Sequence, residues 1–208
     1  ELRRDLRHNL LDLDKMIENL ELKDSLMTRV LRDSVTRDDY RQNFAYAGLT
    51  MTYLTMNFQD NGFASMTRQS EIFNRDFDTL FTSLERLYQG NYGLVESMQE
   101  RLGDFVVGTL ERWSTEKPWL HELSSGRLSE EALDFFLDDP FYLNTVDLYR
   151  TYSSLNMLSS MREAKLKTSL AIVELNQILE PKEDPYAEFE DYLCKPDLAF
   201  WAQDTGYH

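Results

Sequence analysis

The chain has little of the material from which disulfide frameworks, β-rich folds and membrane spans are built. Its 208 residues include one cysteine, eight glycines and five prolines. The lone Cys194 cannot form an internal disulfide or support a cysteine metal cluster. Scarce glycine and proline disfavour an all-β fold, which needs many turns. The longest apolar run, Leu198 to Ala202, is far shorter than the ~20 residues of a bilayer-spanning helix.

Positive charge is also scarce, because 22 Lys and Arg residues stand against 37 Asp and Glu, a net charge of −15. A chain this acidic repels a phosphate backbone, so we expect no nucleic-acid partner. Arg3, Arg4 and Arg7 form only a weak basic end.

Apolar residues are plentiful, at 42% of the chain, and helix-forming leucine, glutamate, arginine and methionine are common. From residue 2 to about residue 34 a stripe with three- and four-residue spacing comprises Leu6, Leu10, Leu13, Ile17, Leu20, Met27 and Leu31. Asp24 fills one position of this heptad-like seam. The stripe predicts a helix of about 50 Å. Since one helix cannot bury its own stripe, other long helices are expected to lie against it.

A second helix is predicted to start just after the first. Thr36 has the chemistry of an N-cap with Asp39 at the third helical position. Val35 can then pack on Tyr40 as a hydrophobic staple, and we expect Gly48 to end the helix.

The stretch that follows is ambiguous. Residues 49–53 alternate apolar and polar side chains, which by itself permits a short strand. We favour a short helix capped by Thr52 and ended by the Asp-Asn-Gly sequence at residues 60–62.

Two further stripes predict two more long helical stretches. The first comprises Phe73, Phe77, Leu80, Leu84 and Leu87, and the second Val95, Met98, Leu102, Phe105, Val106, Leu110 and Trp113. The glycine-containing sequence from Tyr88 to Gly93 separates them and predicts a turn, so that the second would run antiparallel to the first.

The next part of the chain is predicted to be a loop followed by a capped helix. Residues 114–126 contain Pro118 and Gly126 and are typical of a connection. Ser129 is the expected N-cap, and Glu130 and Glu131 suit the first helical turn.

Asp138 and Asp139 could be half of an acidic site, or the start of a helix. Asp139 before Pro140 fits an N-cap followed by proline at the first helical position, and we favour this interpretation. The helix is expected to continue to Ile178, through a stripe of Leu148, Tyr152, Leu155, Leu158, Met161, Leu166, Leu170, Val173 and Ile178.

The chain changes character after residue 180. Residues 181–208 are acidic, contain three of the five prolines, and are rich in aromatics. We expect this segment to dock on the helical domain of residues 1–180, or on a partner. The candidate partner contacts are Tyr186, Phe189, Tyr192, Phe200 and Trp201.

A search for reactive groups yields no catalytic, cofactor-binding or metal-binding residues. Asp5 and His8 form the only carboxylate-x-x-His pair, which we interpret as a solvated helix face, since a di-iron bundle needs more ligands. His121 and Cys194 lack the context of a zinc protease or a nucleophile. The adjacent acids at 130–131 and 183–184 diverge and are not preset for acid–base chemistry. We therefore expect no enzyme and no cofactor.

The order of several short motifs resembles a family of uncharacterised bacterial proteins, a domain of unknown function. The matching stretches are Leu2–Leu6, Thr52–Met56, Asp60–Phe63, Ser70–Tyr88 and Asp139–Asn144. The resemblance covers the chain to about residue 180 and implies no activity. It implies one membrane-spanning helix ahead of Glu1 and a helical domain on the periplasmic side of the bacterial inner membrane. A chain that opens at Glu1 rather than Met fits that expectation.

The sequence thus predicts an all-α bundle of long antiparallel helices, with shorter covering helices and an extended C-terminal segment. The leading functional hypothesis is a membrane-anchored, non-enzymatic interaction or scaffold domain that associates with itself or a protein partner. The alternative is a ligand-sensing helical bundle of a receptor-like protein, which would have a pocket between helices lined by polar groups and a signalling domain elsewhere in the full gene.

Overall fold

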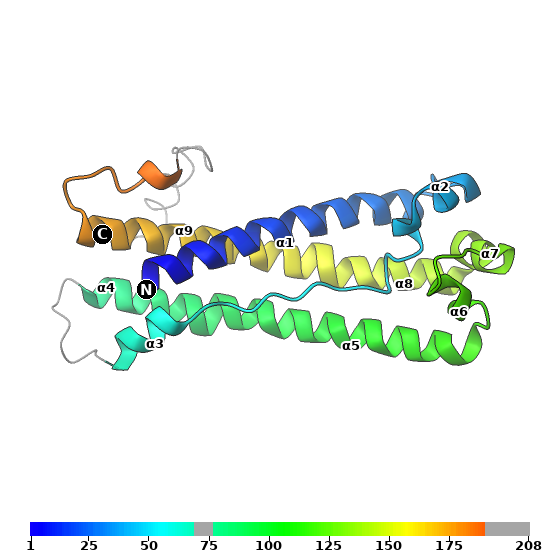
Figure 1. Ribbon diagram of the computed structural model, residues 1–208, viewed down its shortest axis with the longest axis horizontal. Coiled ribbons are helices and arrows are strands. Elements are labelled where there is room, and N and C mark those ends of the chain that lie inside the picture. The colour runs from blue at the N-terminus through cyan, green and yellow to red at the C-terminus, as the bar shows by residue number, and fades with distance from the viewer. Residues whose placement is uncertain (69–76, 190–208) are drawn as a thin grey trace. The chain divides into compact units, whose positions relative to one another are not determined.

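The computed structural model describes residues 1–68 and 77–189, which are all-α as predicted and contain no strand within those two ranges (Figure 1). The α-helices are α1 (Leu2–Leu31), α2 (Arg37–Gln42), α3 (Asn61–Arg68), α4 (Asp78–Glu85), α5 (Gly93–Glu116), α6 (Leu120–Leu123), α7 (Glu130–Asp138), α8 (Pro140–Arg150) and α9 (Leu158–Leu179). Two 3-10 turns, η1 (Phe44–Tyr46) and η6 (Ala187–Phe189), and two π-helical segments, η4 (Arg86–Tyr92) and η5 (Thr151–Met157), join them.

The chain divides into two compact units, each with its own core. Unit 1 comprises residues 1–15, 56–95 and 160–208, and unit 2 comprises residues 16–55 and 96–159. In unit 1, α9 runs antiparallel to the first half of α1 and to α4 (Figure 1). In unit 2, α8 runs antiparallel to the second half of α1 and to α5. In each unit the α1 portion and the α4 or α5 portion run parallel. They are parallel because an extended stretch, residues 52–60, returns the chain before the next helix begins.

The turn predicted between Tyr88 and Gly93 is wrong, because this sequence forms the π-helical segment η4 and leads straight into α5. Gly93 has helical backbone angles, φ −59° and ψ −34°, so nothing turns the chain. The buried positions jump from Leu87 to Tyr92, one residue more than an α-helical step of four. A π segment absorbs that extra residue by widening one turn of the helix.

Part of the stripe predicted for the helix that begins at Pro140 is wrong, because the second π segment, η5, shifts which positions are buried. Leu148, Tyr152 and Leu155 are exposed, and the buried positions are instead Tyr149, Ser153 and Met157. Ser153 Oγ donates a 2.9 Å hydrogen bond back to the carbonyl of Tyr149, a contact that competes with the regular helical ladder. The predicted end of the helix before Pro181 is confirmed, since α9 ends at Leu179.

In unit 1 the extended stretch is fastened by polar side chains of α1. Asn9, which is fully buried, donates from Nδ2 to the Gln59 carbonyl at 3.0 Å and accepts from the Gln59 N–H at 2.7 Å. One turn earlier Asp5 accepts the Gly62 N–H at 2.8 Å, near the start of α3. The expectation that Asp5 lies on a solvated face is therefore wrong, because its exposed fraction is 2%.

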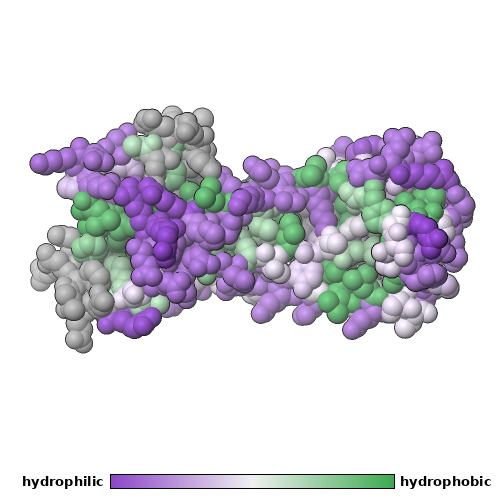
Figure 2. All heavy atoms as spheres, viewed as in Figure 1, coloured by the Kyte–Doolittle hydropathy of each residue, from purple (hydrophilic) through white to green (hydrophobic). Residues whose placement is uncertain are grey.

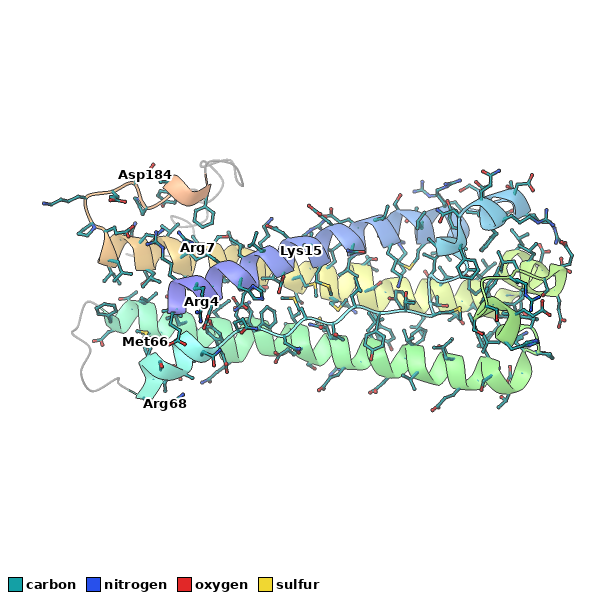
Figure 3. The ribbon with its side chains drawn as sticks, viewed as in Figure 1. Arg4, Arg7, Lys15, Met66, Arg68 and Asp184 are labelled. Atoms are coloured by element: carbon teal, nitrogen blue, oxygen red, sulfur yellow. The ribbon has the colours of Figure 1, made fainter. Side chains whose placement is uncertain are left out.

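These contacts also correct the helix predicted from Thr52 to the Asp-Asn-Gly sequence. Residues 52–60 are extended, and Asp-Asn-Gly begins α3 instead of ending a helix. Gly62 is needed there because a Cβ would lie 2.3 Å from Leu2 Cα. On α3, Met66 is buried whereas Arg68 is not (Figure 3).

The core of unit 1 is aromatic beside this junction. Phe58 stacks on Tyr92 with ring centroids 3.7 Å apart, and Phe63 stacks on Tyr88 at 4.7 Å. The Tyr92 hydroxyl shares a 2.7 Å hydrogen bond with the Thr168 hydroxyl on α9. Such ring pairs add to the stabilisation from area burial alone.

In unit 2 the predicted capping chemistry is confirmed. Thr36 and Asp39 form a capping box at α2, Ser129 caps α7, and Asp139 caps α8 with Pro140 at the first turn. The prediction that Gly48 ends α2 is wrong: α2 stops at Gln42, where the extended backbone of Asn43 begins η1. The loop predicted for 114–126 is partly helical, because α5 extends to Glu116 and α6 follows.

An aromatic cluster fills the core of unit 2. The buried rings of Trp113, Trp119, Phe135, Phe136 and Tyr142 lie with centroids between 4.9 and 6.3 Å apart. The cluster joins α5 and α6 to α7 and α8, elements that the sequence separates by a predicted loop.

Replacing Gly62 by Ala is expected to destabilise the protein by about 3 kcal/mol, because the new methyl group meets backbone that cannot move aside. Gly90→Ala is the matched control in the same unit: nothing lies within 4 Å of its Cβ position, and alanine should stabilise this helical residue by roughly 0.5 kcal/mol. Urea unfolding of both variants measures the two changes. Equal stabilities for the two variants would contradict the close approach of Gly62 to Leu2.

Candidate functional site

Unit 2 contains an open pocket of about 380 Å³, a volume within the range of small-molecule sites. Its walls come from α1, from η1 and the residues after it, and from Leu102 on α5 and Tyr149 on α8. Six of the thirteen lining residues are leucines: Leu20, Leu22, Leu26, Leu49, Leu54 and Leu102. Apolar side chains also reach the mouth, where Leu22, Phe44 and Leu54 are exposed by 64%, 43% and 47%.

Lys23 supplies the one charged group in this lining. Its ammonium donates to the Thr52 carbonyl at 2.5 Å and to the Tyr149 hydroxyl at 2.7 Å. Tyr149 in turn donates to the Thr52 carbonyl at 2.8 Å, and the lysine nitrogen lies 4.5 Å from the centre of the Tyr149 ring. All of these partners are neutral.

The nearest acid in sequence does not compensate the Lys23 charge. Asp24 accepts a 2.8 Å hydrogen bond from Nε of Arg150 on α8 and forms an ion pair with it. This pair also explains why an aspartate can occupy the seam position noted in the sequence: its charge is matched by a neighbour within unit 2.

Burial lowers the pKa of Lys23 to about 8, because desolvation disfavours the charged ammonium. Burial also raises the pKa of the Tyr149 hydroxyl, which therefore stays protonated where the lysine titrates. The site thus presents a cation that is held by dipoles and lies in an apolar lining.

Sequence reasoning missed Lys23, although a signal was present. Lys23 lies three residues after Leu20 and four before Met27, so it occupies a seam spacing itself. The predicted seam has Asp24 at the neighbouring position instead. The signal was the pair of neighbouring charged residues, Lys23 and Asp24, at the edge of an apolar stripe, where a polar contact is expected.

Unit 2 also exposes an apolar ridge, which we define as Leu148, Tyr152 and Leu155. These side chains are spaced four and three residues apart on α8 and η5, with exposed fractions of 44%, 37% and 58%. Tyr152 packs edge-on against Phe105 at 5.8 Å, which fixes one side of the ridge on α5. Figure 2 shows apolar residues reaching the surface of unit 2 among hydrophilic ones.

The acids considered from the sequence are used in caps and ion pairs. Asp139 accepts the Phe141 N–H at 2.8 Å and lies 3.5 Å from Lys117 Nζ, whereas Asp138 is exposed. Glu130 pairs with Arg37 at 3.1 Å and with Arg41 at 2.6 Å on the surface of unit 2.

His8 and His121 are exposed, whereas Arg3 in the basic end is half-buried. His8 pairs with Asp12 at 3.2 Å, and His121 Nδ1 lies 2.6 Å from the Pro118 carbonyl. Arg3 forms a 2.9 Å ion pair with Glu180. Arg4, Arg7 and Lys15 project from α1 in Figure 3.

The C-terminal segment is described only in part. Asn176 on α9 donates to the Pro185 carbonyl at 3.2 Å, and Phe189 is 2% exposed, so this portion packs within unit 1. Tyr186 is half-buried, and its N–H donates to Asp184 at 3.0 Å. The other candidate contacts, Tyr192, Phe200 and Trp201, lie outside the described residues, as do Phe73, Cys194 and His208.

Among the described residues, no helix is long and apolar enough to cross a membrane, and no three His, Cys, Asp or Glu side chains gather as metal ligands would. Comparisons with protein-family models, with curated proteins and with solved structures each found no match.

Replacing Lys23 by Met should change how stability depends on pH. The folded-state pKa of about 8 lies below the ordinary lysine pKa of 10.5, so between these values the unfolded state binds more protons. The wild-type protein should therefore gain on the order of 2 kcal/mol relative to Lys23→Met as the pH rises from 7.5 to 10. Denaturant unfolding at several pH values measures the difference.

Tyrosine titrations above pH 9 occur in both proteins and cancel in this difference. Lys15→Met, which removes an exposed lysine from the same helix, controls for the change in net charge. If the wild-type protein and Lys23→Met kept a constant difference in stability over this pH range, the burial of Lys23 would be disproved.

Proposed function

We propose that the chain is a non-enzymatic interaction domain and that unit 2 carries its recognition surfaces. The observation that supports this is the uneven distribution of exposed large apolar side chains. Eight of the eleven among the described residues belong to unit 2: Leu22, Phe44, Tyr53, Leu54, Val107, Leu148, Tyr152 and Leu155. The three in unit 1 are Leu11, Leu94 and Leu179. Gathered apolar surface of this kind marks interaction sites.

The partner that we propose for the apolar ridge is a second copy of this chain. Four- and three-residue spacing on a helix is the seam pattern through which two helices pack. A two-fold arrangement would place each ridge against the other, as most homodimers do.

The charge around the ridge favours such a contact. In a chain with net charge −15, residues 148–159 carry one ionisable side chain with a full charge, Arg150, and it is already paired with Asp24. The exposed Asp147 lies just before this stretch, so two copies that meet along residues 148–159 bring together no acid of the stretch itself. Three half-exposed side chains form a small patch, so we expect weak association, with a Kd of roughly 0.1 to 1 mM.

We also propose, from the resemblance noted in the sequence, that the domain is tethered to the bacterial inner membrane on its periplasmic side. Tethering suits a weak contact, because confinement raises the effective concentration of two domains without any new interface. The gene sequence that encodes the residues before Glu1 tests this: about 20 apolar residues preceded by Lys and Arg are expected.

A second candidate function is ligand sensing. The pocket in unit 2 favours it, although its lining is mainly apolar and not polar as the sequence hypothesis expected. A volume of about 380 Å³, an aliphatic lining and a small number of placed polar groups are features of small-molecule sites.

Replacing Leu155 by Glu should abolish the self-association, because the ridge would then bring two carboxylates together at its most exposed position. Analytical ultracentrifugation over a concentration series up to about 1 mM measures the change, and we expect at least a tenfold weaker association. Leu22→Glu is the matched control, because Leu22 is equally accessible but lies at the pocket mouth in the same unit. Homotypic association through the ridge would be refuted if the wild-type chain stayed monomeric over the whole concentration series. It would also be refuted if Leu22→Glu weakened the association as much as Leu155→Glu does.

A further inference from the structure

The pocket of unit 2 combines two features that together specify a ligand. Six of its thirteen lining residues are leucines, which come from α1, from residues 49–54 and from α5. At one place in this apolar lining lies the Lys23 ammonium, with hydrogen bonds to a carbonyl and two hydroxyls but to no carboxylate among its partners. A ligand that matches both features has an apolar body and one negative charge.

The lysine has room to exchange one of its bonds for a ligand. Its bonds to the Thr52 carbonyl and to Tyr149 are short, at 2.5 and 2.7 Å, whereas the contact with the Thr52 hydroxyl is 3.3 Å. That hydroxyl also donates to the Gly48 carbonyl at 3.4 Å, a bond that it keeps when its contact with the lysine is lost. An incoming oxygen can therefore replace the Thr52 hydroxyl while the two short bonds hold the ammonium in place.

We propose that this pocket binds a small carboxylic acid with an unbranched apolar chain, its carboxylate on Lys23 Nζ and its chain along the leucines. At about 30 Å³ for a water-sized group, the cavity holds roughly a dozen non-hydrogen atoms, which fits an acid of about eight to ten carbons. A single lysine among neutral groups suits a monoanion, since a phosphate dianion would need further donors.

This inference rests on the second candidate function, ligand binding, and does not depend on homotypic association. The carboxylate would supply the acidic partner that Lys23 lacks among its present contacts. A hydrogen bond between two charged groups in a partly desolvated pocket is stronger than one between neutral groups, so the charge should decide the affinity.

Titration calorimetry of the chain with sodium octanoate and with 1-octanol tests the inference. We expect octanoate to bind with a Kd below about 1 mM and at least tenfold more tightly than octanol. Lys23→Gln keeps a hydrogen-bond donor but removes the charge, and should make the two affinities equal. Lys15→Met changes the net charge equally on an exposed part of α1 and should leave the preference for octanoate unchanged.

An acetylated dipeptide ending in a free leucine carboxylate separates a free acid from a peptide terminus, and it should bind more weakly than octanoate. Four results would each overturn the inference. Two concern the charge: equal binding of octanoate and octanol by the wild-type chain, or an undiminished preference for octanoate in Lys23→Gln. The other two are tighter binding of the dipeptide than of octanoate, and no binding at 10 mM octanoate, roughly tenfold above the expected Kd. Sedimentation of the same variants distinguishes this failure from failure of the proposed function: Lys23→Gln should leave self-association intact.

Discussion

The extended stretch of residues 52–60 imposes the constraint on which much of both units depends. Residues 1–68 and 77–189 place no strand beside it, so within this part of the chain its backbone groups find partners among side chains or water. In unit 1 the buried Asn9 satisfies both the N–H and the carbonyl of Gln59. In unit 2 the Thr52 carbonyl is held by Lys23 and Tyr149. Polar residues on the inner faces of long helices are therefore required by the return of the chain, and they do not weaken the bundle as isolated buried polar groups would.

This constraint gives Lys23 a structural role before any ligand is considered. Its bond to Thr52 fixes the extended stretch, and the same stretch supplies Leu54 to the wall of the pocket. A charge that is kept in place by a backbone carbonyl and a hydroxyl is already oriented, so little would have to rearrange when an anion arrives. The position of Lys23 is thus the same whether it only fixes the extended stretch or also binds an anion. The two interpretations differ only in whether the ammonium has a further partner.

The parts of the fold that sequence predicts well are those governed by local chemistry. The capping residues Thr36, Ser129 and Asp139 act within a few residues, and each cap lies where the pattern places it. The same reasoning fails where the outcome depends on distant residues. Gly62 looks like a helix stop, but it is needed because Leu2 lies against it, and no local pattern contains that contact.

The two π segments show a different limit. A stripe of three- and four-residue steps can be drawn through Leu148 and Leu155 as easily as through Tyr149 and Met157, and one extra residue in η5 decides between them. Periodicity predicts that a helix exists, but its phase after an irregular turn is set by packing against neighbours. The candidate pocket was missed for a similar reason, since its lining comes from segments that only the fold brings together.

The aromatic cluster of unit 2 has a practical consequence for optical measurements. Trp113 and Trp119 both lie in that cluster, while the chain's third tryptophan, Trp201, lies outside the described residues. With Trp201 replaced by phenylalanine, indole emission would report on unit 2 alone, and far-ultraviolet circular dichroism would follow the helices of both units. Whether the two halves of the molecule melt as one body or in sequence can then be read from a single heated sample.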